Sequence, residues 1–127
     1  MDADIDRLNK VTETVIGCAY RVSDNLGCGF LEKIYENALA HELHKTRLKV
    51  EQQRRFNVLY DGIHVGEYIA DLIVENEVIV ETKAVKTFEE IHIAQCLNYL
   101  KATGLKLGLV LNFGTSRVSI KLVVNRF

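Results

Sequence analysis

The spacing of apolar residues divides the chain into helical and extended segments. Apolar positions recur every three to four residues in three segments, which predicts helices over residues 4–24, 31–45 and 88–102. Alternating or continuous apolar runs predict strands over residues 50–60, 63–74, 78–85, 106–113 and 117–124. Asp61-Gly62, between the first two strands, is typical of a two-residue hairpin turn. The order αα-βββ-α-ββ predicts an α+β domain with a mixed sheet of about five strands flanked by helices.

Composition limits the class of protein. A length of 127 residues corresponds to a single domain, 1–127, and 48% hydrophobic with 26% charged residues is typical of a folded globular chain. No apolar run approaches the roughly 20 residues that span a bilayer, and the acidic first residues lack the apolar stretch of a secretory signal. Three scattered cysteines do not suggest a disulfide framework or a zinc knuckle. We therefore expect a reduced, cytoplasmic protein without a membrane span.

The charge is unevenly distributed. The net charge of −1 does not by itself predict a polyanionic partner. From Ile91 onward, however, the chain has no acidic residue and five basic ones: Lys101, Lys106, Arg117, Lys121 and Arg126. A second basic stretch runs from Lys45 to Lys49 and is followed by Arg54-Arg55. These residues are either ordinary solvated surface or contacts for nucleic-acid phosphates.

Glu32 interrupts the apolar face of the second predicted helix. At 100° per residue it falls between Leu39 and Leu43 on that face. Its carboxylate either reaches solvent at the edge of the face or is held inward for a function.

Two predicted strands carry charged residues at apolar positions. Asp71 interrupts residues 68–74, which are apolar on both faces and predict a central, buried strand. Glu81 and Lys83 interrupt the next strand and, being two residues apart, point to the same face. An unpaired buried charge is destabilising, so a specific role is expected for these side chains.

The turn between these strands predicts their register. If Glu75-Asn76-Glu77 is a three-residue loop, Asp71 lies opposite Glu81 with Cβ atoms roughly 4.5–5.5 Å apart, and Ile69 lies opposite Lys83. Two facing carboxylates repel each other, and Mg²⁺, or Mn²⁺ in its place, would remove the conflict. Lys83 would then supply positive charge near an attacking water or a phosphoryl oxygen. The alternative is a structural network of carboxylates and lysine.

The third predicted helix has a polar side next to its apolar stripe. Gln95 on that side either reaches the carboxylates as a hydrogen-bond donor or belongs to a solvent-facing ridge. His92 lacks a partner at ligand spacing and is weak evidence for zinc. The tyrosines at mostly core-type positions are interpreted as packing residues: Tyr20, Tyr35, Tyr60 and Tyr68.

The segment Gly29-Phe30-Leu31-Glu32-Lys33-Ile34-Tyr35 resembles the motif of the GxxExxY proteins, a family within the PD-(D/E)XK nuclease-like superfamily. The resemblance covers nearly the whole chain, through Asp71-Leu72, residues 78–84, residues 91–95, residues 98–101 and residues 108–114. It departs from the usual pattern at Thr82, where leucine is common, and at Arg47, where glycine is frequent.

The resemblance implies a restriction-endonuclease-like core and a role for each motif residue. Asp71 would be the metal-binding aspartate, Glu81-Thr82-Lys83 the E-x-K element, and Glu32 the helical glutamate that completes the metal shell. Gln95 would be the polar residue on the helix that follows. The motif residues are Gly29, Glu32 and Tyr35.

These observations together predict a Mg²⁺-dependent nuclease that acts on nucleic acid, with DNA as the expected substrate. The expected catalytic residues are Glu32, Asp71, Glu81, Lys83 and Gln95, with the metal held by Asp71, Glu81 and Glu32. The expected nucleic-acid contacts are Arg54, Arg55, Lys101, Lys106, Arg117 and Lys121. The alternative is a catalytically silent module of the same fold that serves nucleic-acid binding or protein assembly. Either could act as a homodimer or with a protein partner.

Overall fold

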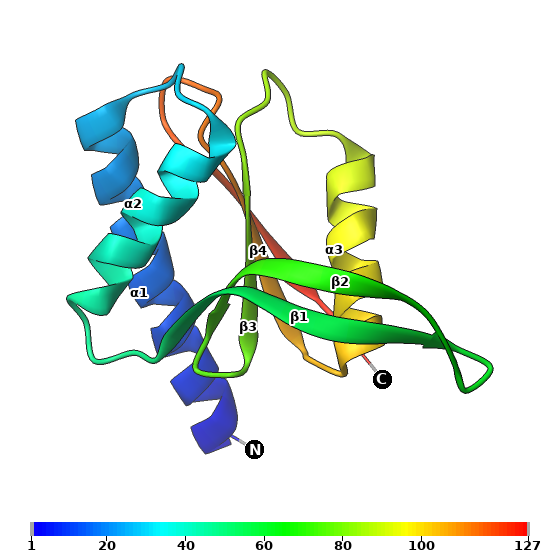
Figure 1. The fold of residues 1–127 in the computed structure, drawn as a ribbon. Coiled ribbons are helices and arrows are strands. Elements are labelled where there is room, and N and C mark those ends of the chain that lie inside the picture. Colours follow the sequence, from blue (N-terminus) through cyan, green and yellow to red (C-terminus); the bar gives the residue numbers. More distant parts are fainter. Residues whose placement is uncertain (1, 127) are drawn as a thin grey trace.

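The structure, a computed structural model, describes residues 2–126 and contains three helices and five strands (Figure 1). In chain order these are α1 (Asp2–Leu26), α2 (Glu32–His44), β1 (Val50–Tyr60), β2 (Ile63–Val74), β3 (Val78–Lys83), α3 (Glu90–Thr103), β4 (Leu107–Asn112) and β5 (Ser119–Val124). This order confirms the predicted αα-βββ-α-ββ arrangement.

The five strands form one mixed sheet in the order β1-β2-β3-β4-β5. Every neighbouring pair is antiparallel except β3 and β4, which are parallel. The parallel pair needs a crossover connection, and α3 provides it by running from the end of β3 back to the start of β4. The predicted α+β class with a mixed five-stranded sheet is therefore confirmed.

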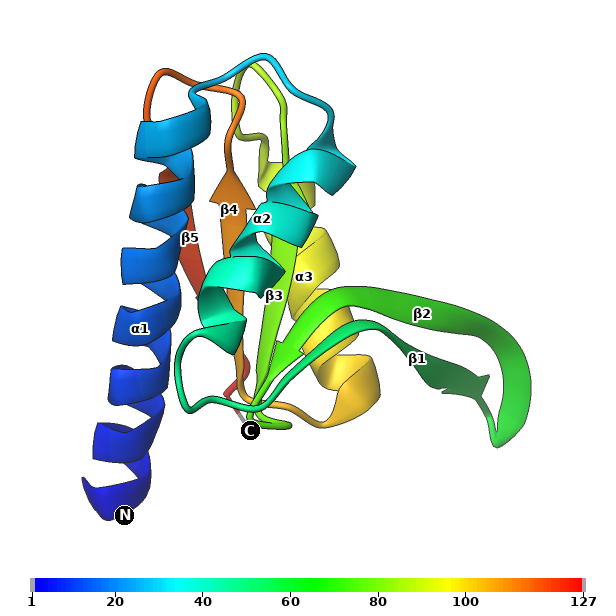
Figure 2. The same ribbon diagram turned by 60° about the vertical axis from the view of Figure 1, so that its left-hand side comes forward.

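The helices cover both faces of the sheet (Figure 2). Helices α1 and α2 pack on one face, over a core that includes Val15, Leu39 and Leu72. We call this the α1–α2 core. Helix α3 packs on the opposite face over a second core that includes Tyr68 and Cys96, the α3 core. Within residues 2–126, no helix is both long enough and apolar enough to cross a membrane.

Local residue choices account for the turns between elements. Asp61 and Gly62 both have positive φ, 53° and 76°, which is the geometry of the predicted two-residue hairpin turn. Gly104, with φ of 77°, ends α3 in the left-handed conformation that glycine adopts without steric penalty.

Helix α3 and strand β3 are shorter at their adjoining ends than the sequence pattern predicted. Strand β3 ends at Lys83 and α3 begins at Glu90, whereas the pattern placed these boundaries at Val85 and Phe88. At the start of α3, Glu89 is the N-cap residue and forms a capping box with His92, so the helix begins at Glu90. At the end of β3, the buried side chain of Asn112 accepts a hydrogen bond from Val85 N and donates one to Val85 O, each at 2.9 Å. Val85 is thereby held in a loop conformation.

Several large apolar residues are exposed. Leu31 and Ile34, at the start of α2, are 77% and 42% exposed. Leu31 precedes α2 as its N-cap residue, and Ile34 lies on the side of α2 away from the sheet core. Tyr60, expected to pack, is 75% exposed because it lies at the end of the β1–β2 hairpin.

Candidate active site

The predicted site lies where β2 separates from β3. Their ladder joins Leu72–Val74 to Val78–Val80 around the turn at residues 75–77, which confirms the three-residue loop and the predicted register. The ladder ends just before Asp71 and Glu81, so Ile69 is not paired with Lys83. Strand β3 continues alongside β4 as far as Lys83, whereas β2 continues with β1 as a projecting two-stranded ribbon (Figure 2). We call this separation the strand fork.

The separation of the strands coincides with a change of face in β2. Tyr68 and Ala70 belong to the α3 core, whereas Leu72 belongs to the α1–α2 core. Regular alternation would place all three on one face, so the strand changes face at Asp71. Ile69 is 40% exposed, which corrects the expectation that residues 68–74 are buried on both faces.

Asp71 and Glu81 bind the backbone amides that the fork leaves unpaired. Asp71 Oδ2 accepts hydrogen bonds from Thr82 N at 2.9 Å and from Thr82 Oγ1 at 3.1 Å. Glu81 Oε2 accepts from the Tyr68 hydroxyl at 2.5 Å and from Asp71 N at 3.3 Å. Amide groups that lose their ladder partners need other acceptors, and the two carboxylates serve as those acceptors.

Each carboxylate keeps one oxygen without a protein donor. Among residues 2–126, no hydrogen bond reaches Asp71 Oδ1 or Glu81 Oε1. The same residues contain no side-chain oxygen that is both buried and without a hydrogen-bond partner. These two oxygens are therefore open to solvent and available to a ligand.

The electrostatics of the pair favour a cation. Burial, and then the charge of Asp71, raises the pKa of Glu81 to about 7. Burial also raises the pKa of Asp71, against the opposing effect of the hydrogen bonds from Thr82. Two such groups resist being ionised together near neutral pH, and a divalent cation would stabilise both charges. The donor chemistry thus fits a Mg²⁺ or Mn²⁺ ion held by two carboxylates.

Lys83, at the end of β3, is close to the carboxylates but is not paired with one. Its positive charge lowers the pKa of Glu32, Asp71 and Glu81, which opposes the effect of burial. Within the described residues, its ammonium makes no ion pair shorter than 4.0 Å. A structural carboxylate–lysine network would require such a pair.

The loop after Lys83 is held rigidly against β4. Phe113 N donates to Lys83 O at 2.8 Å, and Asn112 holds Val85. A Cβ atom at Gly114 would lie 2.2 Å from Val85 O, so only glycine allows this approach. The backbone around Lys83 is therefore fixed by residues of β4 and the segment that follows it, which sequence reasoning had not assigned to the site.

Gly29 and Tyr35 shape the loop from which Glu32 begins α2. Gly29 has φ of 113°, a conformation that residues with a side chain rarely adopt. The Tyr35 hydroxyl donates to Gly27 O at 2.6 Å and accepts from Phe30 N at 3.2 Å. The Tyr35 ring stacks on Phe113, with centroids 4.8 Å apart. The tyrosine thus connects this loop to the end of β4.

Glu32 lies near the carboxylate pair but does not join it. Its pKa is raised by burial and by the negative charges of Asp71 and Glu36, and lowered by Lys83. Its side chain is nevertheless exposed. Across residues 2–126, no three His, Cys, Asp or Glu side chains are grouped so that they could hold a metal ion. Asp71 and Glu81 are therefore the two carboxylates that the structure brings together.

Sequence reasoning missed a second carboxylate of α2, Glu36. Glu36 is buried and accepts hydrogen bonds from Lys33 Nζ at 3.0 Å, Gln52 Nε2 at 2.7 Å and Gln53 Nε2 at 3.0 Å. Its charge contributes to the raised pKa of Asp71. The signal was present, because Glu36 follows Glu32 by four residues and shares its helix face.

Among residues 2–126, Gln95 makes no hydrogen bond to Asp71 or Glu81. Gln95 is exposed on α3 and has no side-chain hydrogen bond to another described residue. Tyr68 of β2 contacts Glu81 instead, and its ring stacks on Tyr99 of α3 with centroids 3.6 Å apart. His92 belongs to the capping box at the start of α3, which gives it a structural role.

The basic residues predicted to hold nucleic acid are spread over the molecule. Each of the arginines has a partner: Asn76 for Arg54, Glu67 for Arg55, and the ring of Tyr20 for Arg117. Lys101 and Lys106 lie at the opposite end of the sheet from Lys83, because Val78 pairs with Leu107 and Lys83 with Asn112. Lys121 is exposed on β5.

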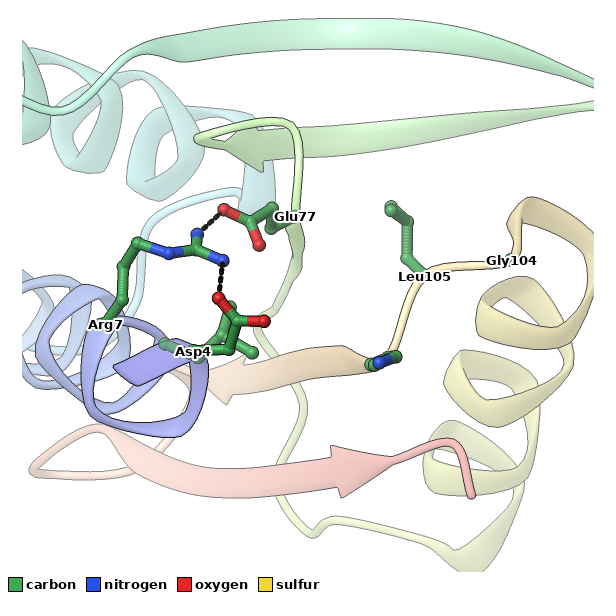
Figure 3. A pocket seen from close by; sticks show the side chains of 7 residues that line it. Asp4, Arg7, Glu77, Gly104 and Leu105 are labelled. Carbon is green, nitrogen blue, oxygen red and sulfur yellow. Dashed lines mark hydrogen bonds and ion pairs between the residues drawn. The ribbon is translucent and has the colours of Figure 1, made fainter. Parts of the chain in front are cut away.

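A separate pocket of about 200 Å³ lies beside the β2–β3 turn (Figure 3). Its charges balance, because Arg7 of α1 bonds both Glu77 and Asp4 and Lys106 also lines the pocket. The pocket is at the end of β3 opposite Lys83, so it is not part of the carboxylate site.

Comparison with known proteins identifies a family for the fold. A family model described as the PD-(D/E)XK nuclease superfamily matches residues 9–126. No protein of curated function matches the chain. The solved structure titled "Crystal structure of SSO0001" is similar with a TM-score of 0.55 and 17% sequence identity, over 75% of this chain. At this identity the likeness shows a shared fold, and the match covers 51% of that protein.

Proposed function

This chain belongs to the PD-(D/E)XK nuclease superfamily, and on that premise we propose that it is a Mg²⁺-dependent nuclease that hydrolyses phosphodiester bonds in DNA. One observation carries the proposal. Asp71 and Glu81 each keep one open oxygen at the strand fork, beside Lys83, which has no ion-pair partner among residues 2–126. A purely structural cluster has no need of open carboxylate oxygens or of an unpaired ammonium group.

Asp71 and Glu81 would hold the ion through their open oxygens, with Glu32 contributing through a water molecule. Mg²⁺ suits such a site because it usually binds one or two carboxylates and retains several waters. When bound, the ion supplies positive charge that polarises a phosphoryl oxygen and lowers the pKa of a nearby water. Mn²⁺ would serve as a substitute.

Lys83 would act on the reacting groups themselves. An ammonium group carries three donors and can orient the attacking water or stabilise the negative charge that develops on the phosphate. The hydrogen bond from Phe113 to Lys83 O supports this role, because it fixes the backbone that carries the side chain. Gln95, exposed on α3, would add a polar contact to substrate or water.

Nucleic acid would be held through its phosphates by Arg54, Arg55, Lys101, Lys106, Arg117 and Lys121. These side chains lie on several elements, so a single short duplex would not contact all of them at once. A homodimer or a protein partner would resolve this difficulty by placing cations of two chains along one substrate. The chain spans about half the length of SSO0001.

The test is cleavage of supercoiled plasmid and of single-stranded DNA with Mg²⁺, with Mn²⁺ and with EDTA. We expect cleavage with either ion and none with EDTA. Lys83→Ala should lose on the order of 10²-fold or more in rate while keeping its fold. Lys83→Met retains the aliphatic stem and controls for lost packing, and Lys10→Ala on α1 controls for the loss of a surface charge. Full activity in both Lys83 variants would remove this residue from the mechanism.

A second candidate is a catalytically silent module that binds nucleic acid or assembles with protein. The observation that favours it is the absence, within residues 2–126, of three grouped metal-ligating side chains. DNA binding that is unaffected by EDTA, without cleavage of any nucleic acid, would support this candidate over the nuclease.

A further inference from the structure

The two carboxylates are held by two buried hydroxyl groups in a reciprocal arrangement. Strand β2 carries Asp71 and Tyr68, and strand β3 carries Glu81 and Thr82. The Tyr68 hydroxyl donates to Glu81, and the Thr82 hydroxyl donates to Asp71. Each strand thus supplies one carboxylate and the hydroxyl that restrains the carboxylate of the other strand.

The backbone reinforces this arrangement. Asp71 N donates to the same Glu81 oxygen that Tyr68 contacts, and Thr82 N donates to the same Asp71 oxygen that the Thr82 hydroxyl contacts. One oxygen of each carboxylate therefore receives two donors and the other receives none from residues 2–126. Thr82 is fully buried and Tyr68 is 5% exposed, so both hydroxyls are shielded from competing water.

Packing also limits the movement of both hydroxyls. The Tyr68 ring stacks on Phe56 of β1 and on Tyr99 of α3, with centroids at 5.9 and 3.6 Å. Thr82 lies within the parallel ladder, opposite Leu111 of β4. Neither residue can turn its hydroxyl away from its carboxylate without disturbing a packed core.

We propose that Tyr68 and Thr82 are positioning residues that restrict Glu81 and Asp71 to one metal-binding oxygen each and thereby select Mg²⁺ or Mn²⁺ over Ca²⁺. Mg²⁺ is octahedral and is commonly bound by single oxygens of one or two carboxylates, together with water. Ca²⁺ takes six to eight oxygens, and a carboxylate that binds through both oxygens helps to provide them. A carboxylate with one oxygen already engaged by a hydroxyl and an amide does not readily bind in that way.

This inference rests on the metal site of the proposed function, and metal binding alone can test it. Isothermal titration calorimetry is carried out with Mn²⁺, Mg²⁺ and Ca²⁺ on metal-free wild type, Tyr68→Phe and Thr82→Val. Both variants keep the shape of the side chain and remove only the hydroxyl donor. We expect Mn²⁺ affinity to fall by roughly 10–100-fold, the usual effect of removing a group that orients a metal ligand. Ca²⁺ affinity should fall less, so the ratio of Mn²⁺ to Ca²⁺ affinity decreases.

Three variants serve as controls. Thr82→Ser keeps the hydroxyl that Thr82→Val lacks, so it should keep the metal affinity and selectivity of the wild type. Tyr99→Phe removes a hydroxyl that has no hydrogen bond among residues 2–126, and Thr12→Val removes one that donates to Asn9 O in α1. Both should bind metal as the wild type does. Circular dichroism in EDTA establishes that each variant is folded, and Thr82→Val carries the test if Tyr68→Phe is not.

The outcomes separate this inference from the proposed function. Wild-type affinity and selectivity in folded Tyr68→Phe and Thr82→Val would overturn the inference and leave the nuclease proposal intact. Equal losses for Mn²⁺ and Ca²⁺ would overturn the selectivity role. The metal site of the proposed function is itself wrong if the wild type binds neither Mn²⁺ nor Ca²⁺. It is also wrong if Asp71→Asn binds these ions as tightly as the wild type does.

Discussion

Replacing Glu81 by glutamine should make the metal-free protein more stable at alkaline pH. Glu81 is 8% exposed, and its pKa is raised from 4.5 to about 7 by burial and by the charge of Asp71. The folded state therefore holds this proton more tightly than the unfolded state does. The stability that this group contributes is fully present below about pH 4.5 and is lost as the pH rises through about 7.

The size of this stability change follows from the pKa shift of Glu81. Each unit of pKa difference corresponds to about 1.4 kcal/mol, so ionisation of Glu81 destabilises the fold by about 3 kcal/mol above pH 8. Glutamine removes the ionisation, and its amide oxygen can still accept from the Tyr68 hydroxyl and from Asp71 N. We therefore expect Glu81→Gln to exceed the wild type by up to about 3 kcal/mol at pH 8 and to match it at pH 4.5.

Urea unfolding followed by circular dichroism, from pH 4.5 to 8.5 in EDTA, measures the free energy of unfolding of the wild type and of Glu81→Gln. Saturating Mg²⁺ should reverse the order at pH 8, because the ion binds the carboxylate of the wild type and not the amide of the variant. Glu13→Gln, on the exposed surface of α1, is the control for loss of a charge. A stability difference that does not change with pH, or a wild type that is the more stable at pH 8 in EDTA, would refute this reasoning.

Three further predictions concern the metal, the charged surface and the loop after β3. Asp71→Asn should abolish the rise in melting temperature that Mn²⁺ produces in the wild type, as measured by differential scanning calorimetry, and equal Mn²⁺ affinity in both proteins would contradict the proposed site. Replacing Lys101, Lys106 and Lys121 by glutamine should reduce the steepness of log K against log[salt] for DNA binding, by about one for each phosphate that is no longer neutralised. An unchanged slope would show that these lysines are ordinary surface residues. Gly114→Ala should destabilise the fold by roughly 1–3 kcal/mol in urea unfolding, because the added Cβ would lie 2.2 Å from Val85 O. Gly66→Ala is the control, because a Cβ there has open space, and a smaller loss of stability in Gly114→Ala than in Gly66→Ala would contradict this prediction.

The local features of this protein could be predicted from its sequence because they depend on neighbouring residues. Apolar periodicity predicted all eight elements in order, and the Asp61-Gly62 dipeptide predicted the hairpin turn. The three-residue turn at residues 75–77 set the register that brings Asp71 close to Glu81. Proximity of these two carboxylates therefore followed from side-chain alternation and turn length alone.

Only the tertiary structure decided how these carboxylates are presented. The strand fork at Asp71 depends on β2 changing from one core to the other, and no local pattern records which helix a residue will face. The same holds for the contact of Tyr68 with Glu81 and of Glu36 with Gln52, since each joins residues more than ten positions apart. Gln95 shows the converse, because helical spacing placed it on the polar side of α3 but could not determine whether it reaches the site. Periodicity specifies the direction of a side chain relative to its own element, whereas packing between distant elements determines what that side chain meets.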